Sequence, residues 1–120
     1  MKRDMELIRE ILFYIEAHDN VSVVVDGYDQ RAISYHIRLL SEAKLIHAAV
    51  LSSNSGEIVV QESGQTRLTW DGHEFVDAAR EPTRWNKVKS ALGDATIGAY
   101  IGLLNQVAVH YATKAVGLED

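Results

Sequence analysis

The segment that most constrains the fold is residues 32–46, AISYHIRLLSEAKLI, because its apolar residues recur at helical spacing. Ile33, Ile37 and Leu40 fall at i, i+4 and i+7 and therefore share one side of a helix. A helix with one apolar side buries that side against the rest of its domain. We therefore expect a helix from Asp29 or Gln30 to Ala43 whose apolar side anchors the domain core.

The other side of this helix is polar and carries candidate contacts to nucleic acid. Tyr35 and Arg38 are the strongest candidates, and Ser34, Arg31 and Gln30 lie beside them. Such side chains contact phosphates and bases in protein–DNA complexes. In a winged helix-turn-helix protein the second helix presents this side to the major groove. The alternative is an ordinary solvated helix face, on which arginine and serine are common.

The chain before this segment predicts a helix over residues 4–17 and a short strand. The helix is indicated by apolar residues that step along one face: Met5, Ile8, Leu12 and Ile15. Asp4 can cap its first turn. The β-branched run Ser22–Val25, ended by Asp26-Gly27, reads as a strand and a turn. Residues 20–29 are too few for the extra helix of a conventional helix-turn-helix.

The chain after residue 43 predicts a left-handed residue and a β-hairpin. Lys44 stands where the helix should end in a left-handed conformation, which costs on the order of 1 kcal/mol relative to glycine. Residues 46–51 and 57–60 read as two strands joined by a turn over 52–56. This hairpin is a candidate wing. Because its tip lacks lysine and arginine and Glu57 and Glu62 flank it, we expect it to serve packing or another partner.

Three further helices are expected. One covers residues 70–79 and is capped by Thr69, another covers 83–92 with Pro82 in its first turn, and the last covers 96–116 with Asp94 or Thr96 as its cap. Trp70 and Trp85 are expected to be hydrophobic anchors that tie these helices to the N-terminal domain.

The last helix carries an apolar run that is nearly long enough to span a bilayer. Polar residues cluster on one of its faces, so we read it as amphipathic and not as a membrane span. It packs on the N-terminal domain or pairs with a second copy, to which a G-x-x-x-G spacing would allow close approach. The residues expected at a homodimer interface are Ile97, Gly98, Ile101, Gly102, Leu104, Ala108 and Tyr111.

Composition and charge narrow the function. The chain has no cysteine, and its five histidines lack ligand spacing, so no metal, cofactor or enzymatic activity is expected. No signal peptide opens the sequence, which favours the cytoplasm. The net charge of −5 is awkward for a nucleic-acid binder, but residues 80–92 carry four cations against one carboxylate, a balance of +3. Arg84 and Lys87 in this cluster are candidate contacts to flanking phosphates.

Four stretches together resemble an uncharacterised family of small bacterial and prophage proteins that carries a domain-of-unknown-function label. They are MKRDMELIREIL, YHIRLLSEAKLI, LTWDGHEFVDAAR and WNKVK, in that order along most of the chain. The resemblance implies a winged-helix-like domain with a C-terminal helical extension and assigns no chemistry. Members of the family typically have glycine where Lys44 stands. YHIRLLSEAKLI is also similar to the recognition helix of MarR-type regulators.

These observations predict an α+β, mainly helical fold: a winged helix-turn-helix-like domain over residues 1–80 and helices over 81–120 that complete the core and mediate a homodimer. The expected function is DNA binding in transcriptional control of a prophage or host operon. The alternative is a non-catalytic protein-interaction module, such as a phage factor that binds a host protein, on the same scaffold without DNA binding.

Overall fold

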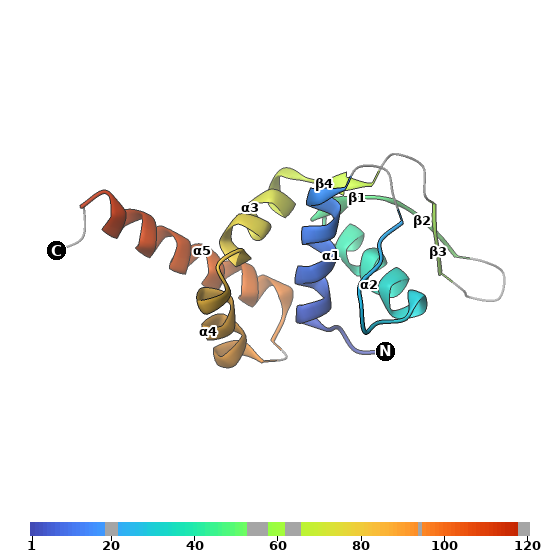
Figure 1. Ribbon diagram of the computed structural model, residues 1–120, viewed down its shortest axis with the longest axis horizontal. Coiled ribbons are helices and arrows are strands. Elements are labelled where there is room, and N and C mark those ends of the chain that lie inside the picture. The colour runs from blue at the N-terminus through green and yellow to red at the C-terminus, as the bar shows by residue number, and fades with distance from the viewer. Residues whose placement is uncertain (19–21, 53–57, 62–65, 94, 118–120) are drawn as a thin grey trace. The chain divides into compact units, whose positions relative to one another are not determined.

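The computed structural model describes residues 1–18, 22–52, 58–61, 66–93 and 95–117, which form an α+β, mainly helical fold (Figure 1). Its helices are α1 (Met5–Ala17), α2 (Gln30–Glu42), α3 (Trp70–Ala79), α4 (Pro82–Leu92) and α5 (Ile97–Ala115). Its strands are β1 (Ile46–His47), β2 (Ala49–Ser52), β3 (Ile58–Gln61) and β4 (Arg67–Leu68). The chain divides within α3 into two units, residues 1–74 and 75–120.

Helix α1 begins and ends where the sequence predicts. The Asp4 side chain caps it by accepting hydrogen bonds from the backbone N–H groups of Glu6 and Leu7, at 3.0 and 3.2 Å. The apolar side of α1 is buried in the first unit, where it packs beside α2 and β4. Its buried residues are Met5, Leu7, Ile8, Ile11, Leu12 and Ile15.

The strand predicted for residues 22–25 is wrong. The described residues between α1 and α2 form no ladder with another segment, and without a partner a β-branched run does not become a strand. Val23 is buried, whereas its neighbour Val24 is 59% exposed. The predicted turn is present: Tyr28 N–H donates to the Val25 carbonyl at 3.3 Å, and Gly27 takes a φ of 87°.

Helix α2 confirms its predicted extent and buried side. Asp29 caps it by accepting from the Ala32 N–H at 2.8 Å, and Ile33, Ile37 and Leu40 are at most 2% exposed. The helix ends in the left-handed residue predicted from the sequence, Lys44, at a φ of 63°. That conformation turns the chain from α2 directly into β1.

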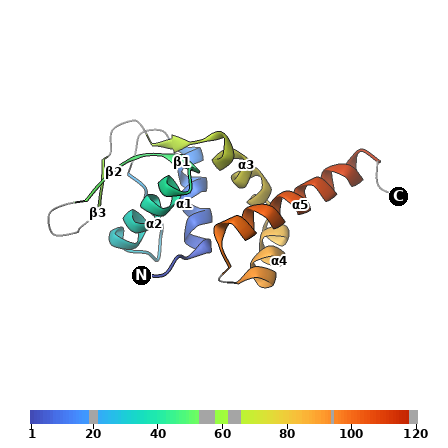
Figure 2. The ribbon, with the colours of Figure 1, turned by 180° about the vertical axis from the view of Figure 1, so that it is seen from behind.

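The strands form two separate two-stranded ladders. β2 pairs antiparallel with β3, and Val50 lies opposite Val60. β1 pairs antiparallel with β4, which places Ile46 opposite Leu68 and His47 opposite Arg67. The predicted hairpin is therefore present, but its first strand is divided at residue 48, and β4 was missed. The hairpin lies beside α2 in Figures 1 and 2, with β3 as the strand in contact. The predicted turn falls largely on residues 53–56, which lie outside the described residues.

A glycine permits close approach at the start of α3. A Cβ at Gly72 would collide with the Leu45 carbonyl. The same carbonyl accepts a hydrogen bond from the Thr69 N–H at 3.0 Å. As predicted, Thr69 caps α3, since its Oγ1 accepts from the Gly72 N–H at 3.0 Å.

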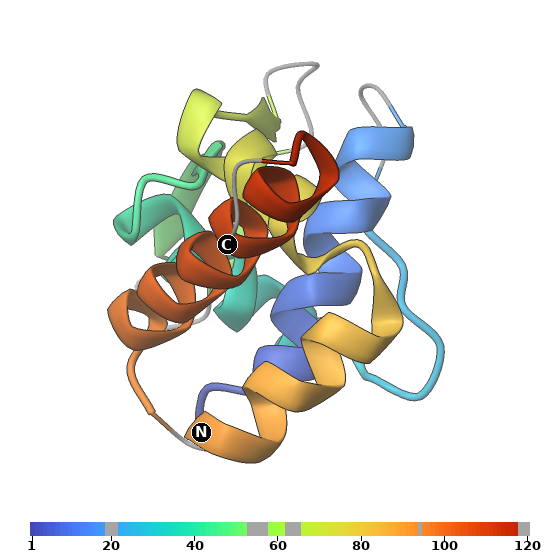
Figure 3. The same ribbon diagram turned by 90° about the vertical axis from the view of Figure 1, so that its left-hand side faces the viewer.

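The second unit is built around Trp85. Its ring lies 5.6 Å from that of Tyr100 and 6.3 Å from that of Phe75, and all three side chains are at most 3% exposed. Tyr100 donates its hydroxyl to the Gly93 carbonyl at 2.6 Å, which ties α5 to the end of α4. α4 packs against α5, and the second half of α5 continues past it (Figures 1 and 3).

The two tryptophans have different environments. Trp85 is 1% exposed and is an anchor as predicted, although its ring contacts lie within the second unit. Trp70 is 79% exposed, so its prediction as an anchor is wrong. The reason is positional: Trp70 is the first residue of α3, and the buried side of that helix begins with Gly72 and Phe75.

The tryptophans provide a matched pair of substitutions. We expect Trp85→Ala to lower the free energy of unfolding by about 3–5 kcal/mol, because it opens a large cavity in the second unit. Trp70→Ala should change it by no more than about 0.5 kcal/mol, because the ring is exposed. Urea unfolding followed by far-ultraviolet circular dichroism measures both. Equal effects of the two substitutions would contradict the assigned core.

Candidate nucleic-acid interface

The exposed side of α2 carries one continuous polar stripe. Arg31, Tyr35, Arg38 and Glu42 fall at i, i+4, i+7 and i+11 and so follow the helix axis on one face. Arg31, Arg38 and Glu42 are exposed and Tyr35 is half-buried. We call these four residues the α2 stripe. The buried residues Ile33, Ile37 and Leu40 hold the opposite side of the helix in the core, so the stripe faces outward.

The two arginines of the stripe differ in their partners. Arg38 Nε lies 3.2 Å from Glu42 Oε1, and the two side chains are 46% and 60% exposed. Pairs of this spacing on a helix surface contribute about 0.3–0.5 kcal/mol, so a phosphate can compete with Glu42. Among the described residues, no carboxylate lies within ion-pair distance of Arg31. Of the two stripe arginines, Arg31 is therefore the one without a carboxylate partner among the described residues.

Two predicted contacts lie at the first turn of α2. Gln30 is exposed, and its Nε2 donates to the Ser34 hydroxyl at 3.3 Å. Ser34 is 8% exposed, so its prediction as a DNA contact is corrected: it supports Gln30 from beneath the surface. The helical angle explains the error, because Ser34 lies closer to the apolar side of α2 than Tyr35 and Arg38 do.

His36 fixes α2 against the start of α1. The ring is 2% exposed and makes two hydrogen bonds of 2.8 Å. Nε2 accepts from the backbone N–H of Asp4, so Nδ1 carries the proton that is donated to the Ala32 carbonyl. A neutral ring with this tautomer satisfies both partners. His36 is therefore a packing residue that connects the two helices.

Asp4 extends this contact to the loop before α2. Its Oδ2 accepts the Tyr28 hydroxyl at 3.0 Å, while its Oδ1 caps α1. Burial and then the hydrogen bond to Asp4 raise the pKa of the Tyr28 phenol above its ordinary value of 10.0. One aspartate therefore joins α1, α2 and the loop between them. We call Asp4, Tyr28 and His36 the Asp4 cluster.

The second basic group lies on α4, in the other unit. Arg84 is half-buried, and its Nε lies 3.7 Å from Glu81 Oε2. Glu81 caps α4, and the backbone N–H groups of Arg84 and Thr83 lower the pKa of its carboxyl.

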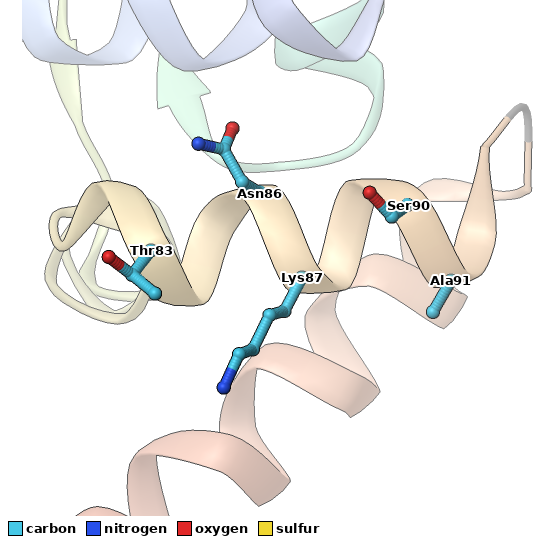
Figure 4. A pocket seen from close by; sticks show the side chains of 5 residues that line it. All are labelled: Thr83, Asn86, Lys87, Ser90 and Ala91. Atoms are coloured by element: carbon cyan, nitrogen blue, oxygen red, sulfur yellow. The ribbon is translucent and has the colours of Figure 1, made fainter.

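Lys87 is exposed and borders a shallow, open depression (Figure 4). The depression is lined by Thr83, Asn86, Lys87, Ser90 and Ala91. Lys87 is thus the more accessible cation of the two.

The residues predicted at a homodimer interface separate into groups. Leu104 is 1% exposed and packs inside its own chain, so its assignment to a dimer interface is corrected. Ile97 and Ile101 are half-buried, whereas Gly98 and Gly102 are exposed. The side chains of Ala108 and Tyr111 lie outside the described part of the structure. Tyr100, which the sequence did not single out, is buried in the second unit together with Leu104.

Two kinds of site are absent from the described residues. No group of three or more histidine, aspartate or glutamate side chains comes together there as metal ligands would. No helix in this part of the chain has the length and apolar character needed to cross a membrane.

The Asp4 cluster generates a prediction about alkaline pH. Because the pKa of Tyr28 is higher in the folded chain, its contribution to stability is complete below pH 10 and is lost as the pH rises through the folded value. We expect the urea midpoint of the wild type to fall between pH 8 and pH 11 by more than that of Tyr28→Phe. An equal fall in the two proteins would show that the Tyr28 hydroxyl is not linked to folding.

Comparison with known proteins gives a family without a described activity. The family DUF2513, described as "Hypothetical protein (DUF2513)", matches residues 2–98. An uncharacterised protein of Haemophilus influenzae is 35% identical over 114 residues, which cover 90% of this chain and 92% of the relative. No solved structure matches the chain. The matched span contains α1–α4, the α2 stripe and the Asp4 cluster, and the chain belongs to the DUF2513 family.

Proposed function

We propose that this protein binds duplex DNA in the manner of a winged helix-turn-helix protein and regulates transcription of a prophage or bacterial operon. In this proposal α2 enters the major groove, the β2–β3 hairpin lies beside it as the wing, and the protein acts in the cytoplasm as a homodimer. The observation that carries it is the α2 stripe, which places two arginines and a tyrosine on the outward side of a helix held in the core.

The order of the elements supports this proposal. In the first unit α1 packs against α2, and a two-stranded hairpin follows α2 and contacts it through β3. A recognition helix followed by a hairpin is the arrangement that such DNA-binding domains use. The segment before α2 is a loop and not a helix, but the Asp4 cluster anchors it through Tyr28. The stripe therefore does not depend on a preceding helix for its position.

The chemistry of the stripe suits both phosphate and base contacts. Arginine can neutralise a phosphate or donate two hydrogen bonds to guanine. The amide of Gln30, at the first turn, could both donate to and accept from adenine. In the absence of DNA this amide donates to the Ser34 hydroxyl. Arg84 and Lys87 on α4 would add phosphate contacts. With so few cations the binding of one chain should be weak, and a dimer on two half-sites would strengthen it.

The rival function is a protein-interaction module on the same scaffold. The net charge of −5 favours it, since an acidic chain repels the phosphates of DNA. The Arg38–Glu42 pair also favours it, because that pair occupies one of the two arginines of the stripe. If the rival is correct, substitutions in the α2 stripe should not change DNA affinity. If our proposal is correct, removing a positive charge from the stripe should weaken DNA binding, and removing a negative charge should strengthen it.

The test measures binding to a fluorescent mixed-sequence duplex by anisotropy at low salt. Arg31→Ala should weaken binding several-fold and reduce the salt slope by about 0.9, the value for one phosphate contact. Glu42→Gln should strengthen binding, because it releases Arg38 from its partner. Lys114→Ala removes an exposed cation from α5 and is the matched control.

The signs of these effects decide between the two functions. A loss with Arg31→Ala, a gain with Glu42→Gln and no change with Lys114→Ala would support DNA binding through α2. Equal losses with Arg31→Ala and Lys114→Ala would indicate unspecific attraction of any cation. No binding by the wild type at low salt would rule out the proposed function and leave the rival.

A further inference from the structure

We propose that the homodimer is formed by a parallel pairing of α5, through a seam that shares Gly98 and Gly102 with the interface expected from the sequence and otherwise differs from it. The seam consists of five exposed residues of α5 and the exposed residue that ends the helix, at alternating steps of four and three: Gly98, Gly102, Asn105, Val109, Ala112 and Val116. This spacing keeps one line of side chains facing a partner helix as two helices coil around each other. We call these six residues the α5 seam. The inference rests on the homodimer part of the proposed function and not on DNA binding.

The seam lies opposite the side of α5 that the chain itself uses. Tyr100 and Leu104, which are at most 1% exposed, pack inward in the second unit. Val109 and Val116 are 64% and 68% exposed. No described side chain between residues 105 and 116 is buried. The described side chains in the last turns of α5 are thus exposed or half-buried, and isolated helices of this length are marginal in water.

The glycines of the seam have no explanation within a single chain. A Cβ at Gly102 would meet nothing within 4 Å, and one at Gly98 would meet only the Thr96 hydroxyl at 3.9 Å. Each glycine inside a helix costs about 0.5–1 kcal/mol relative to alanine. Close approach of a second helix accounts for both, because glycine allows backbones to come together.

Asn105 makes a second copy the occupant that fits best. Its amide both donates and accepts, so it can pair with the same amide of a symmetry-related chain. An apolar partner surface would leave this amide without a hydrogen bond, whereas a second copy supplies one. Residues 97–113 contain no charged side chain, so two copies can pair without burying a charge or opposing like charges. Parallel pairing places Asn105 against its copy.

The pairing should be weak on its own. Six residues per chain form the seam, whereas a standard interface takes about 20–30 residues from each side. We therefore expect a monomer–dimer equilibrium that depends on concentration. A duplex carrying two half-sites would raise the local concentration of the two seams. The absence of DNA from the experiments below keeps them independent of the proposed DNA binding.

A cross-linking experiment tests the seam and its direction. The chain contains no cysteine, so a single introduced thiol reports its own position. In a parallel pair the two copies of residue 109 face each other, and a disulfide needs Cα atoms about 4.4–6.8 Å apart. Val109→Cys should therefore form a covalent dimer in oxidised glutathione. His110→Cys, one residue away and also exposed, is the control and should form far less.

Sedimentation equilibrium measures the non-covalent dimer directly. The wild type should shift from monomer towards dimer as its concentration rises. Val109→Glu should stay monomeric, because it opposes like charges in the seam, whereas His110→Glu should dimerise as the wild type does. A wild type that stays monomeric at every concentration, or equal cross-linking at positions 109 and 110, would overturn the proposal. Both results can be read whether or not the protein binds DNA.

Discussion

The hydrogen bond from the Asp4 N–H to Nε2 of His36 is the contact on which the proposed function depends. It is 2.8 Å long, its acceptor is buried, and it joins the start of α1 to the middle of α2. A buried polar group without a partner costs about 1–3 kcal/mol, so this pair admits one arrangement of the two helices. The arrangement turns Ile33 and Ile37 inward and the α2 stripe outward. The orientation of the candidate interface is therefore a consequence of the core.

The carboxylate of Glu42 limits the affinity that the α2 stripe can have for DNA phosphates. Glu42 holds Arg38 in an exposed pair of small energy, and Arg31 has no such partner among the described residues. One free and one occupied cation cannot hold DNA tightly against the acidity of the whole chain. Affinity would have to come from two copies acting together. The proposed α5 seam would bring two copies together through a helix other than α2.

Local chemistry explains what the sequence predicted correctly. The caps Asp4 and Thr69, the left-handed Lys44 and the apolar periodicity of α1 and α2 are properties of a few neighbouring residues. The errors concern partners distant in sequence. Residues 22–25 have strand-forming side chains but no ladder, and β4 is a strand only because β1 lies beside it.

In the candidate site, too, the sequence predicted features that depend on neighbouring residues and not those that depend on distant partners. Periodicity placed Arg31, Tyr35 and Arg38 on the outward side of α2, but it could not show that Ser34 is buried beneath Gln30. The spacing of Arg38 and Glu42 was readable as an i, i+4 pair and was overlooked. The Asp4 cluster brings together residues up to 32 positions apart, and no pattern in one sequence indicates such a contact. Trp70 could not be told from Trp85 by residue type.

The central claim is that the α2 stripe is the surface that meets DNA. The most direct measurement is an ¹H–¹⁵N correlation spectrum of the labelled protein recorded while a short duplex is added at low salt. We expect the shifted amides to cluster along α2 from Arg31 to Glu42 and in the adjoining β3 strand, and those of α1 to remain in place. Spectra that do not change, or changes confined to α5, would contradict it.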